Sequence, residues 1–184
     1  ICFMDGVHPT HNVQPAYGWI KRGVRKEIPA NTGRERLNLS GVIDVVSHNI
    51  VIQEDQTLNA ESTIRFFKKV EEAYPSKRKI HVFCDNASYY RNKAVKQHLK
   101  TSKVCLHFLP PYSPNLNPIE RLWKWMKERV IYNTYYEHFE DFKGAIFGFF
   151  AVLSTVTAES ILGQTLRGRV RDKFRPIGAP ATNF

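Results

Sequence analysis

The stretch KIHVFCDN, residues 79–86, decides the fold class of this 184-residue chain. Its alternating and apolar residues predict a strand that ends at Asp85 and Asn86. A second strand is predicted at 104–109, where two prolines stop it, and a short basic helix is predicted between them at 92–100. Parallel neighbours in a sheet are typically joined by such a helical crossover. The sequence therefore favours an α/β fold.

The rest of the chain adds a meander of strands and three longer helices. The first strand is expected to stop at the turn Asp5-Gly6, and the helix that begins at Asn59 is expected to stop at Pro75. The strands that end near Asp85 and Leu109 are expected to run parallel to the first strand. The remaining predicted strands are 1–4, 17–20, 37–46 and 50–53, and the remaining predicted helices are 59–75, 118–131 and 139–153.

The composition indicates a globular, strongly basic protein. Lysine and arginine number 27 against 17 acidic residues, which gives a formal charge of +10. With 42% hydrophobic and 12% aromatic residues, the disordered and collagen-like classes are excluded. The longest apolar run, 145–153, is interrupted by Gly148, so no membrane span and no membrane partner are expected. The charge favours a polyanionic partner, with nucleic acid as the leading candidate.

Three cysteines and two early histidines are the candidates for disulfide or metal sites. Cys2, Cys84 and Cys105 contain no C-x-x-C pair, so they are expected to be reduced, buried thiols. His8 and His11 form a His-x-x-His pair in a predicted loop. Without further ligands at metal-binding spacing, structural or DNA-contacting roles are favoured for both histidines.

Two carboxylates, Asp5 and Asp85, follow strands that this layout makes adjacent and parallel. Ligands of open α/β sheets collect at the carboxyl edge of such strands. An Asp after an apolar strand is also a common turn former, and this alternative stays open for each residue alone.

A third carboxylate, Glu120, lies at the start of a predicted helix. Asn117 as N-cap, Pro118 at the first helical position and Glu120 at the third form a variant of the capping box. A capping role and a ligand role do not exclude each other. Three converging carboxylates would supply the hard oxygen ligands that Mg²⁺ prefers, and paired Mg²⁺ ions assist in-line phosphoryl transfer.

Four strings carry a resemblance to a known family. The longest is LPPYSPNLNPIERLW at 109–123, and the others are FMDGVHP at 3–9, AYGW at 16–19 and FCDNA at 83–87. They resemble the DDE-type transposases of bacterial insertion sequences related to the mariner superfamily. The 34 residues between Asp85 and Glu120 match the separation of the second and third acidic residues in this branch.

The resemblance implies a ribonuclease-H-like α/β fold with a mixed five-stranded sheet, three strands antiparallel and two parallel, flanked by helices. It implies that Asp5, Asp85 and Glu120 are catalytic and bind two Mg²⁺ ions, for which Mn²⁺ can substitute. Water would cut the transposon end, and the freed 3′-OH would attack double-stranded target DNA, typically at TA. It further implies a homodimer in the active complex and a bacterial cytoplasmic, nucleoid-associated location.

The resemblance also predicts the domain organisation. Residues 1–165 are expected to form the catalytic domain and 166–184 a basic C-terminal tail. Members of the family carry an N-terminal helix-turn-helix region that recognises transposon ends, and nothing before Asp5 could fold as one. The chain is therefore expected to be the catalytic core without that region.

Several further side chains have weaker predicted roles. Asn86 is interpreted as orienting the Asp85 carboxylate, as accepting a hydrogen bond from a metal-bound water, or as part of the turn that ends the strand. The candidate phosphate contacts are basic, and a solvated surface is the alternative for those on the helix at 118–131. These candidates are Lys21, Arg22, Arg25 and Lys26 in an early hairpin, Arg121, Lys124 and Lys127 on the helix, and Arg167, Arg169, Arg171, Lys173 and Arg175 in the tail. The aromatic residues expected in the core are Trp123, Phe147, Phe149 and Phe150.

Two other functions stay open at this point. The first is a catalytically silent or domesticated DNA-binding module, and the second is a ribonuclease H acting on RNA–DNA hybrids. Only an enzyme would cut DNA in the presence of Mg²⁺ or Mn²⁺ and stop when EDTA is added. The proline-rich stretch and the acidic spacing argue against ribonuclease H.

Overall fold

The computed structural model describes residues 1–16, 22–23, 25, 27–31, 33–111 and 116–153. The predicted strand at 17–20 and the predicted tail at 166–184 lie outside these residues. Five strands form one sheet in the order β3-β2-β1-β4-β5, antiparallel from β3 to β1 and parallel from β1 to β5. This confirms the predicted mixed sheet. The strands are β1 (Cys2–Val7), β2 (Leu39–Asp44), β3 (Ile50–Glu54), β4 (Ile80–Cys84) and β5 (Val104–Phe108).

The expected stop of the first strand at Asp5-Gly6 is wrong. β1 runs on through both residues to Val7 because β2 pairs with it along its whole length, with Asp5 opposite Gly41 and Val7 opposite Leu39. An Asp-Gly pair favours a turn locally, but ladder hydrogen bonds and burial of the flanking residues outweigh that preference here. Asp5 therefore lies inside a strand and not in a flexible turn.

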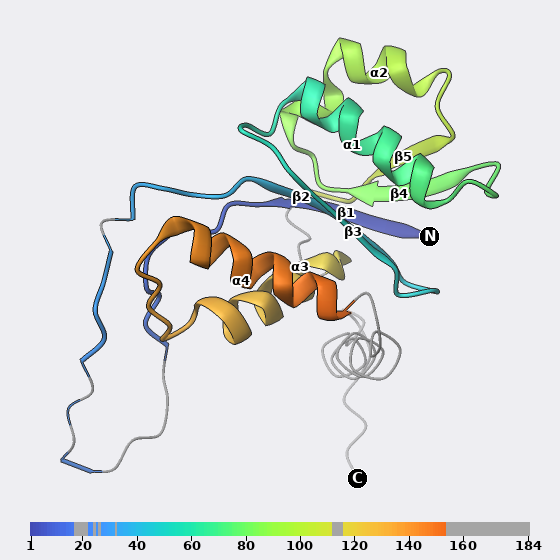
Figure 1. The fold of residues 1–184 in the computed structure, drawn as a ribbon. Helices are drawn as coiled ribbons and strands as arrows, with labels where there is room; N and C mark the ends of the chain where they lie inside the picture. The colour runs from blue at the N-terminus through green and yellow to red at the C-terminus, as the bar shows by residue number, and fades with distance from the viewer. Residues whose placement is uncertain (17–21, 24, 26, 32, 112–115, 154–184) are drawn as a thin grey trace, which may run out of the picture.

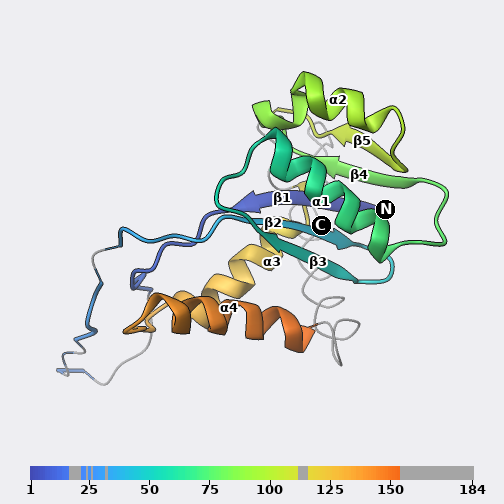
Figure 2. The same cartoon turned by 45° about the horizontal axis from the view of Figure 1, so that its top comes forward.

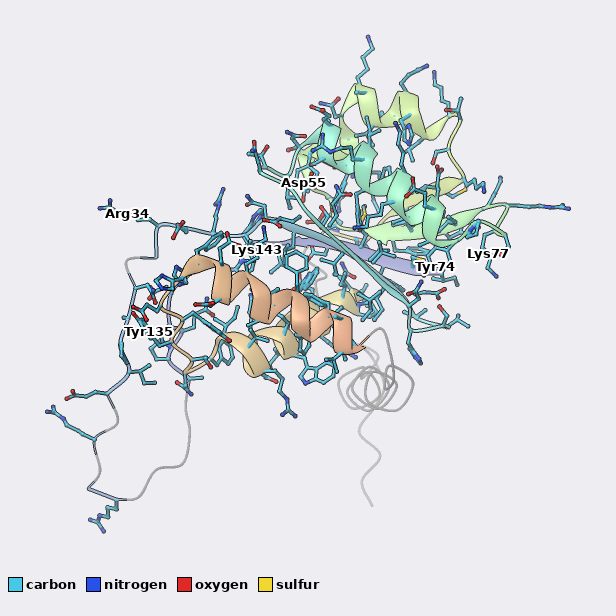
Figure 3. The ribbon with its side chains drawn as sticks, in the orientation of Figure 1. Arg34, Asp55, Tyr74, Lys77, Tyr135 and Lys143 are labelled. Carbon is cyan, nitrogen blue, oxygen red and sulfur yellow. The ribbon has the colours of Figure 1, made fainter. Side chains whose placement is uncertain are left out.

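The helices cover the two faces of the sheet, as Figure 1 and Figure 2 show. α1 and α2 lie over one face, and α3 and α4 lie over the other. On the second face, the Nζ of Lys143 on α4 lies 2.8 Å from an Oε2 of Glu54 at the end of β3 (Figure 3). The helical elements are α1 (Ala60–Ala73), η1 (Ser88–Arg91), α2 (Lys93–Leu99), α3 (Ile119–Met126), the π-helical segment η3 (Lys127–Ile131) and α4 (Phe139–Val152).

Each face has its own hydrophobic core, and the strands alternate between them. Met4 of β1 and Val82 of β4 pack towards α1, with Phe66 and Phe67 of that helix. Leu39 and Ile43 of β2 belong to the core under α3 and α4. Because side chains alternate along a strand, Asp5 points to the α3 face.

The remaining core predictions hold in most details. The apolar stripe of the predicted helix at 118–131 is buried, and Trp123 and Phe150 are buried with it. Phe147 and Phe149 are partly buried against the same core. The three cysteines are free; Cys2 and Cys84 are buried, whereas Cys105 is only half-buried. Within the described residues, no helix is long and apolar enough to cross a membrane.

The predicted capping box at Asn117 is wrong. The residue that caps α3 is Pro118, and no side chain bonds to the backbone there. The Nδ2 of Asn117 instead donates to the backbone carbonyl of Met4 in β1, at 3.1 Å. This contact orients the Asn117 side chain towards the sheet, and its Oδ1, the atom that would cap a helix, makes no hydrogen bond to the α3 backbone. The capping box of α1 is real, since Asn59 accepts from the backbone of Ser62 and the Ser62 hydroxyl accepts from the Asn59 N–H.

Candidate active site

Asp5 and Asp85 lie at the same level of neighbouring parallel strands. Cys2 pairs with Val82 and Phe3 with Phe83, and continuing this register brings Asp5 beside Asp85. Asp85 is exposed as the first residue after β4, and its Oδ1 accepts from the backbone N–H of Ala87 at 3.2 Å. Asp85 therefore forms a turn, as the alternative interpretation of this residue predicts. The turn leaves the carboxylate at the carboxyl edge of the sheet.

Glu120 reaches this edge from the first turn of α3, where its side chain is exposed. The helix contacts β1 and β2, so its first turn lies near the end of the sheet that carries Asp5. Burial and, after it, the negative charge of Glu120 raise the pKa of Asp5 from 3.8 to about 7, and the charge of Asp85 contributes a smaller part of this increase. The backbone N–H of Gly6 and the Trp123 indole oppose the increase by hydrogen bonding. Three carboxylates from different parts of the chain thus interact at one edge.

The donor set suits a hard divalent cation. All three side chains offer oxygen, and a bound cation would relieve the repulsion that raises the pKa of Asp5. As the side chains stand, no three His, Cys, Asp or Glu residues in the described part of the chain are close enough to share one metal ion. For all three carboxylates to share one ion, their side chains would have to come closer together.

Two side chains of the α3 segment join it to β1 next to the site. The indole Nε1–H of Trp123 donates to Oδ2 of Asp5 at 3.1 Å, and Asn117 holds the carbonyl of Met4. Sequence reasoning assigned Trp123 to the core alone. Its burial is as predicted, but the contact with Asp5 was missed because the helical period identifies the buried face and not what that face touches.

On the other side of Asp85, polar contacts fix the ends of β4 and β5. The Nδ2 of Asn86 donates to the carbonyl of Leu109 at 2.7 Å, and Arg91 donates to the Oδ1 of Asn86. The Arg91 guanidinium also lies 4.3 Å from the centre of the Phe108 ring. Asn86 therefore has the turn-stabilising role. Tyr89, which sequence reasoning missed, is close enough to the carboxylates that they add to the increase of its pKa, after burial.

The two early histidines have structural partners. An Nε2 of the buried His11 lies 2.9 Å from the carbonyl of Tyr136, and Nδ1 of His8 lies 2.7 Å from the Oδ1 of Asn38. These contacts support the structural interpretation over a metal pair. They fasten the segment after β1 to Asn38, just before β2, and to the loop before α4.

The candidate DNA contacts are only partly within the described residues. Arg22 and Arg25 are exposed, and on α3 Lys124 is exposed with its Nζ 3.8 Å from Glu128. Arg121 and Lys127 are half-buried. The candidates Lys21, Lys26, Arg167, Arg169, Arg171, Lys173 and Arg175 lie outside the described residues.

The sheet order and the three acidic residues at its carboxyl edge define a ribonuclease-H-like fold of the DDE class. The DDE superfamily endonuclease family matches residues 1–143, and the chain belongs to this family. The chain is 22% identical over 134 residues to the "Insertion element IS630 uncharacterized 39 kDa protein" of Shigella sonnei, covering 72% of this chain and 39% of that protein. The resemblance to transposases of the IS630 and mariner type is thereby confirmed.

Solved structures confirm the ribonuclease-H-like fold. The Mos1 strand transfer complex superposes with a TM-score of 0.63 and 19% identity, over 86% of this chain and 48% of the Mos1 chain. The integrase catalytic core domain of HTLV-2, solved in complex with magnesium, superposes with a TM-score of 0.57 and 12% identity, over 90% of this chain and 91% of that domain. The chain therefore spans less than half of the IS630 protein and of Mos1, and nearly all of a catalytic core.

Proposed function

We propose that this chain is the catalytic domain of a transposase that cuts DNA at transposon ends and joins the freed 3′-OH to target DNA. The observation that carries the proposal is the electrostatic coupling of Asp5, Asp85 and Glu120 at the carboxyl edge of β1 and β4. A carboxylate held in place by a structural ion pair would lie beside a cation. In the site, two acidic neighbours surround Asp5 instead.

Asp5, Asp85 and Glu120 would hold divalent metal ions, Mg²⁺ in the first place. The magnesium in the HTLV-2 integrase core and the oxygen donors of this site support that choice. When bound, the ions would activate the attacking hydroxyl and stabilise the leaving oxygen of a phosphoryl transfer. The protein's part is to present the carboxylates in their ionised form and to hold β1, β4 and α3 in a fixed relation.

The partner is proposed to be double-stranded DNA, as transposon end and as target, with TA as the target sequence. The charge of +10 and the exposed Arg22, Arg25 and Lys124 support phosphate contacts. Because two transposon ends must be brought together, the active complex is proposed to be a homodimer. Residues 1–165 would form the catalytic domain, and 166–184 would contribute phosphate contacts.

The decisive experiment measures nicking of supercoiled plasmid with Mg²⁺ or Mn²⁺. The Asp85→Asn and Glu120→Gln variants are expected to lose cleavage by at least a thousandfold while keeping the fold and salt-sensitive DNA binding. Glu140→Gln is the matched control, because Glu140 is also an exposed acid in the first turn of a helix, α4. It should cleave like the wild type, and EDTA should stop cleavage.

The same assay separates the other functions. Undiminished cleavage by both variants would overturn the assignment. DNA binding by the wild type without any metal-dependent cleavage would identify a silent DNA-binding module. Cleavage confined to RNA–DNA hybrids would identify a ribonuclease H.

A further inference from the structure

The hydrogen bond between Trp123 and Asp5 links the core of the α3 face to the site. Trp123 is 2% exposed and lies one turn after Glu120 on α3. Its Nε1–H donates to Oδ2 of Asp5 at 3.1 Å. An indole N–H is a donor only and carries no charge. It can therefore hold a carboxylate oxygen without neutralising the charge that a metal ion needs.

Gly41 creates the space that brings the indole to Asp5. Gly41 is directly opposite Asp5 in the antiparallel β1–β2 ladder, and directly opposed residues share one face of a sheet. A Cβ at position 41 would lie 2.4 Å from Cη2 and 2.7 Å from Cζ2 of Trp123. The six-membered ring of the indole thus occupies the place of the missing side chain. The indole N–H, next to this ring, then lies beside Asp5, the residue that pairs with Gly41 on the neighbouring strand.

The indole is packed on several sides. The rings of Trp123 and Phe150 form a T-shaped pair at a centroid distance of 6.0 Å, and Ile119 and Met126, one turn before and one turn after Trp123 on the helix, are buried. Asn117 fixes the beginning of the same segment to the Met4 carbonyl. A side chain held on several sides by packed groups keeps one rotamer.

We propose that Trp123 is a positioning residue that holds the Asp5 carboxylate in one orientation for metal binding, in a slot that Gly41 opens. The proposal rests on the proposed function in one respect, since it takes Asp5 as a metal ligand. The residue does not touch the reacting atoms. Its effect is to leave the remaining lone pairs of Asp5 turned towards the side of Asp85 and Glu120.

The first test detects the hydrogen bond without metal or DNA. The indole N–H signals of the three tryptophans are recorded by ¹H–¹⁵N NMR and assigned with Trp123→Phe and Trp125→Phe. Asp5→Ala is expected to shift the Trp123 signal upfield and to leave the Trp125 signal in place, because Trp125 packs on Phe149 and not on the site. An unmoved Trp123 signal would overturn the proposal.

The second test measures Mg²⁺ affinity by calorimetry on the full chain. Trp123→Phe keeps an aromatic ring but removes the donor, and it is expected to weaken binding about tenfold or more, as outer-shell partners of metal ligands do. Trp125→Phe is the control for losing an indole. Leu122→Ala is the control for damage to the core, because it removes an equally buried neighbour without a polar group. Both controls should bind Mg²⁺ like the wild type.

The outcomes separate the two proposals. Weaker binding in Glu120→Gln with unchanged binding in Trp123→Phe overturns the positioning role and leaves the proposed function standing. Equal weakening in Trp123→Phe and Leu122→Ala also overturns it, since packing alone would then explain the effect. Failure of the wild type to bind Mg²⁺ overturns both proposals.

Discussion

The two faces of the sheet are built differently. Under α1 and α2 the core is apolar, with Phe66 and Phe67 packed on Met4 and Val82. The polar contacts of α1 with the sheet include two to the edge strand β3, from Lys69 to the Ile52 carbonyl and from Gln53 to the Ser62 carbonyl. Under α3 the core is also apolar, but there polar side chains of the α3 segment reach the central strand β1. Trp123 bonds to Asp5 and Asn117 bonds to Met4.

This difference assigns separate tasks to the faces. At the central strands, the α1 face is held to its helices by burial, which is non-directional. The α3 face fixes direction as well, because hydrogen bonds have preferred angles and lengths. Asp5 points to the α3 face, so the directional contacts are where the site needs them.

The largest expected effect is on the apolar face. Phe66→Ala removes a 1% exposed ring from the core under α1 and is expected to cost about 3–5 kcal/mol of stability. Urea unfolding measures this loss. The folded fraction should bind Mg²⁺ with unchanged affinity, since no polar contact to Asp5 is lost. A tenfold drop in affinity would contradict the division between the faces.

Substitution of two glycines on neighbouring strands allows the two faces to be compared directly. Gly41→Ala would place a Cβ 2.4 Å from the buried Trp123 ring and is expected to cost about 1–3 kcal/mol. Gly6→Ala, on the α1 face, would place a Cβ 2.6 Å from Cδ1 of Leu58, the end of a half-buried flexible chain. It should cost less, because Leu58 can rotate. Thermal unfolding of both variants gives the order, and the reverse order would contradict the rigid fit of Trp123.

The pH dependence of stability tests the repulsion at Asp5. Its pKa is about 7 in the fold against 3.8 as the ordinary value. Between these values the folded state holds a proton that the unfolded chain has released, so stability falls as pH rises from about 4 to about 7. The loss is expected to be roughly 1–2 kcal/mol after allowing for solvent screening.

Urea unfolding at pH 4 and pH 8, without metal, measures that loss. Asp5→Asn should remove it and be more stable than the wild type at pH 8. Added Mg²⁺ should restore stability to the wild type at pH 8 and not to Asp5→Asn. A wild type that gains stability over this range would contradict the assigned environment of Asp5.

The smallest effect concerns the local cap of α1. Asn59→Ala removes the acceptor that the Ser62 N–H uses and is expected to cost about 1 kcal/mol. Asn59→Ser keeps a capping oxygen and should recover most of the loss. The change is read by thermal unfolding, and Mg²⁺ affinity should stay constant. A loss in both variants alike would show that the cap is not the cause.

Much of the fold was readable from the sequence because its signals are local. The strand at 80–84, the helix after Asn59 and the parallel crossover follow from alternation, a cap and turn residues within a few positions of one another. Asp85 and Glu120 were located by their motifs. The predicted turn at Asp5-Gly6 is wrong because β2 pairs with the backbone of these residues. No residue close to Asp5 in the sequence indicates that pairing.

By itself, the sequence determined the order of elements and the family, and it proposed the three acidic residues of the candidate site. Only the tertiary structure decided how they are held. Asn117 became a bridge to Met4 instead of a cap, and Trp123 reached Asp5 across 118 positions through a gap at Gly41. Local propensities act between chain neighbours, whereas these contacts exist only once α3 has packed on the sheet and excluded water from the interface.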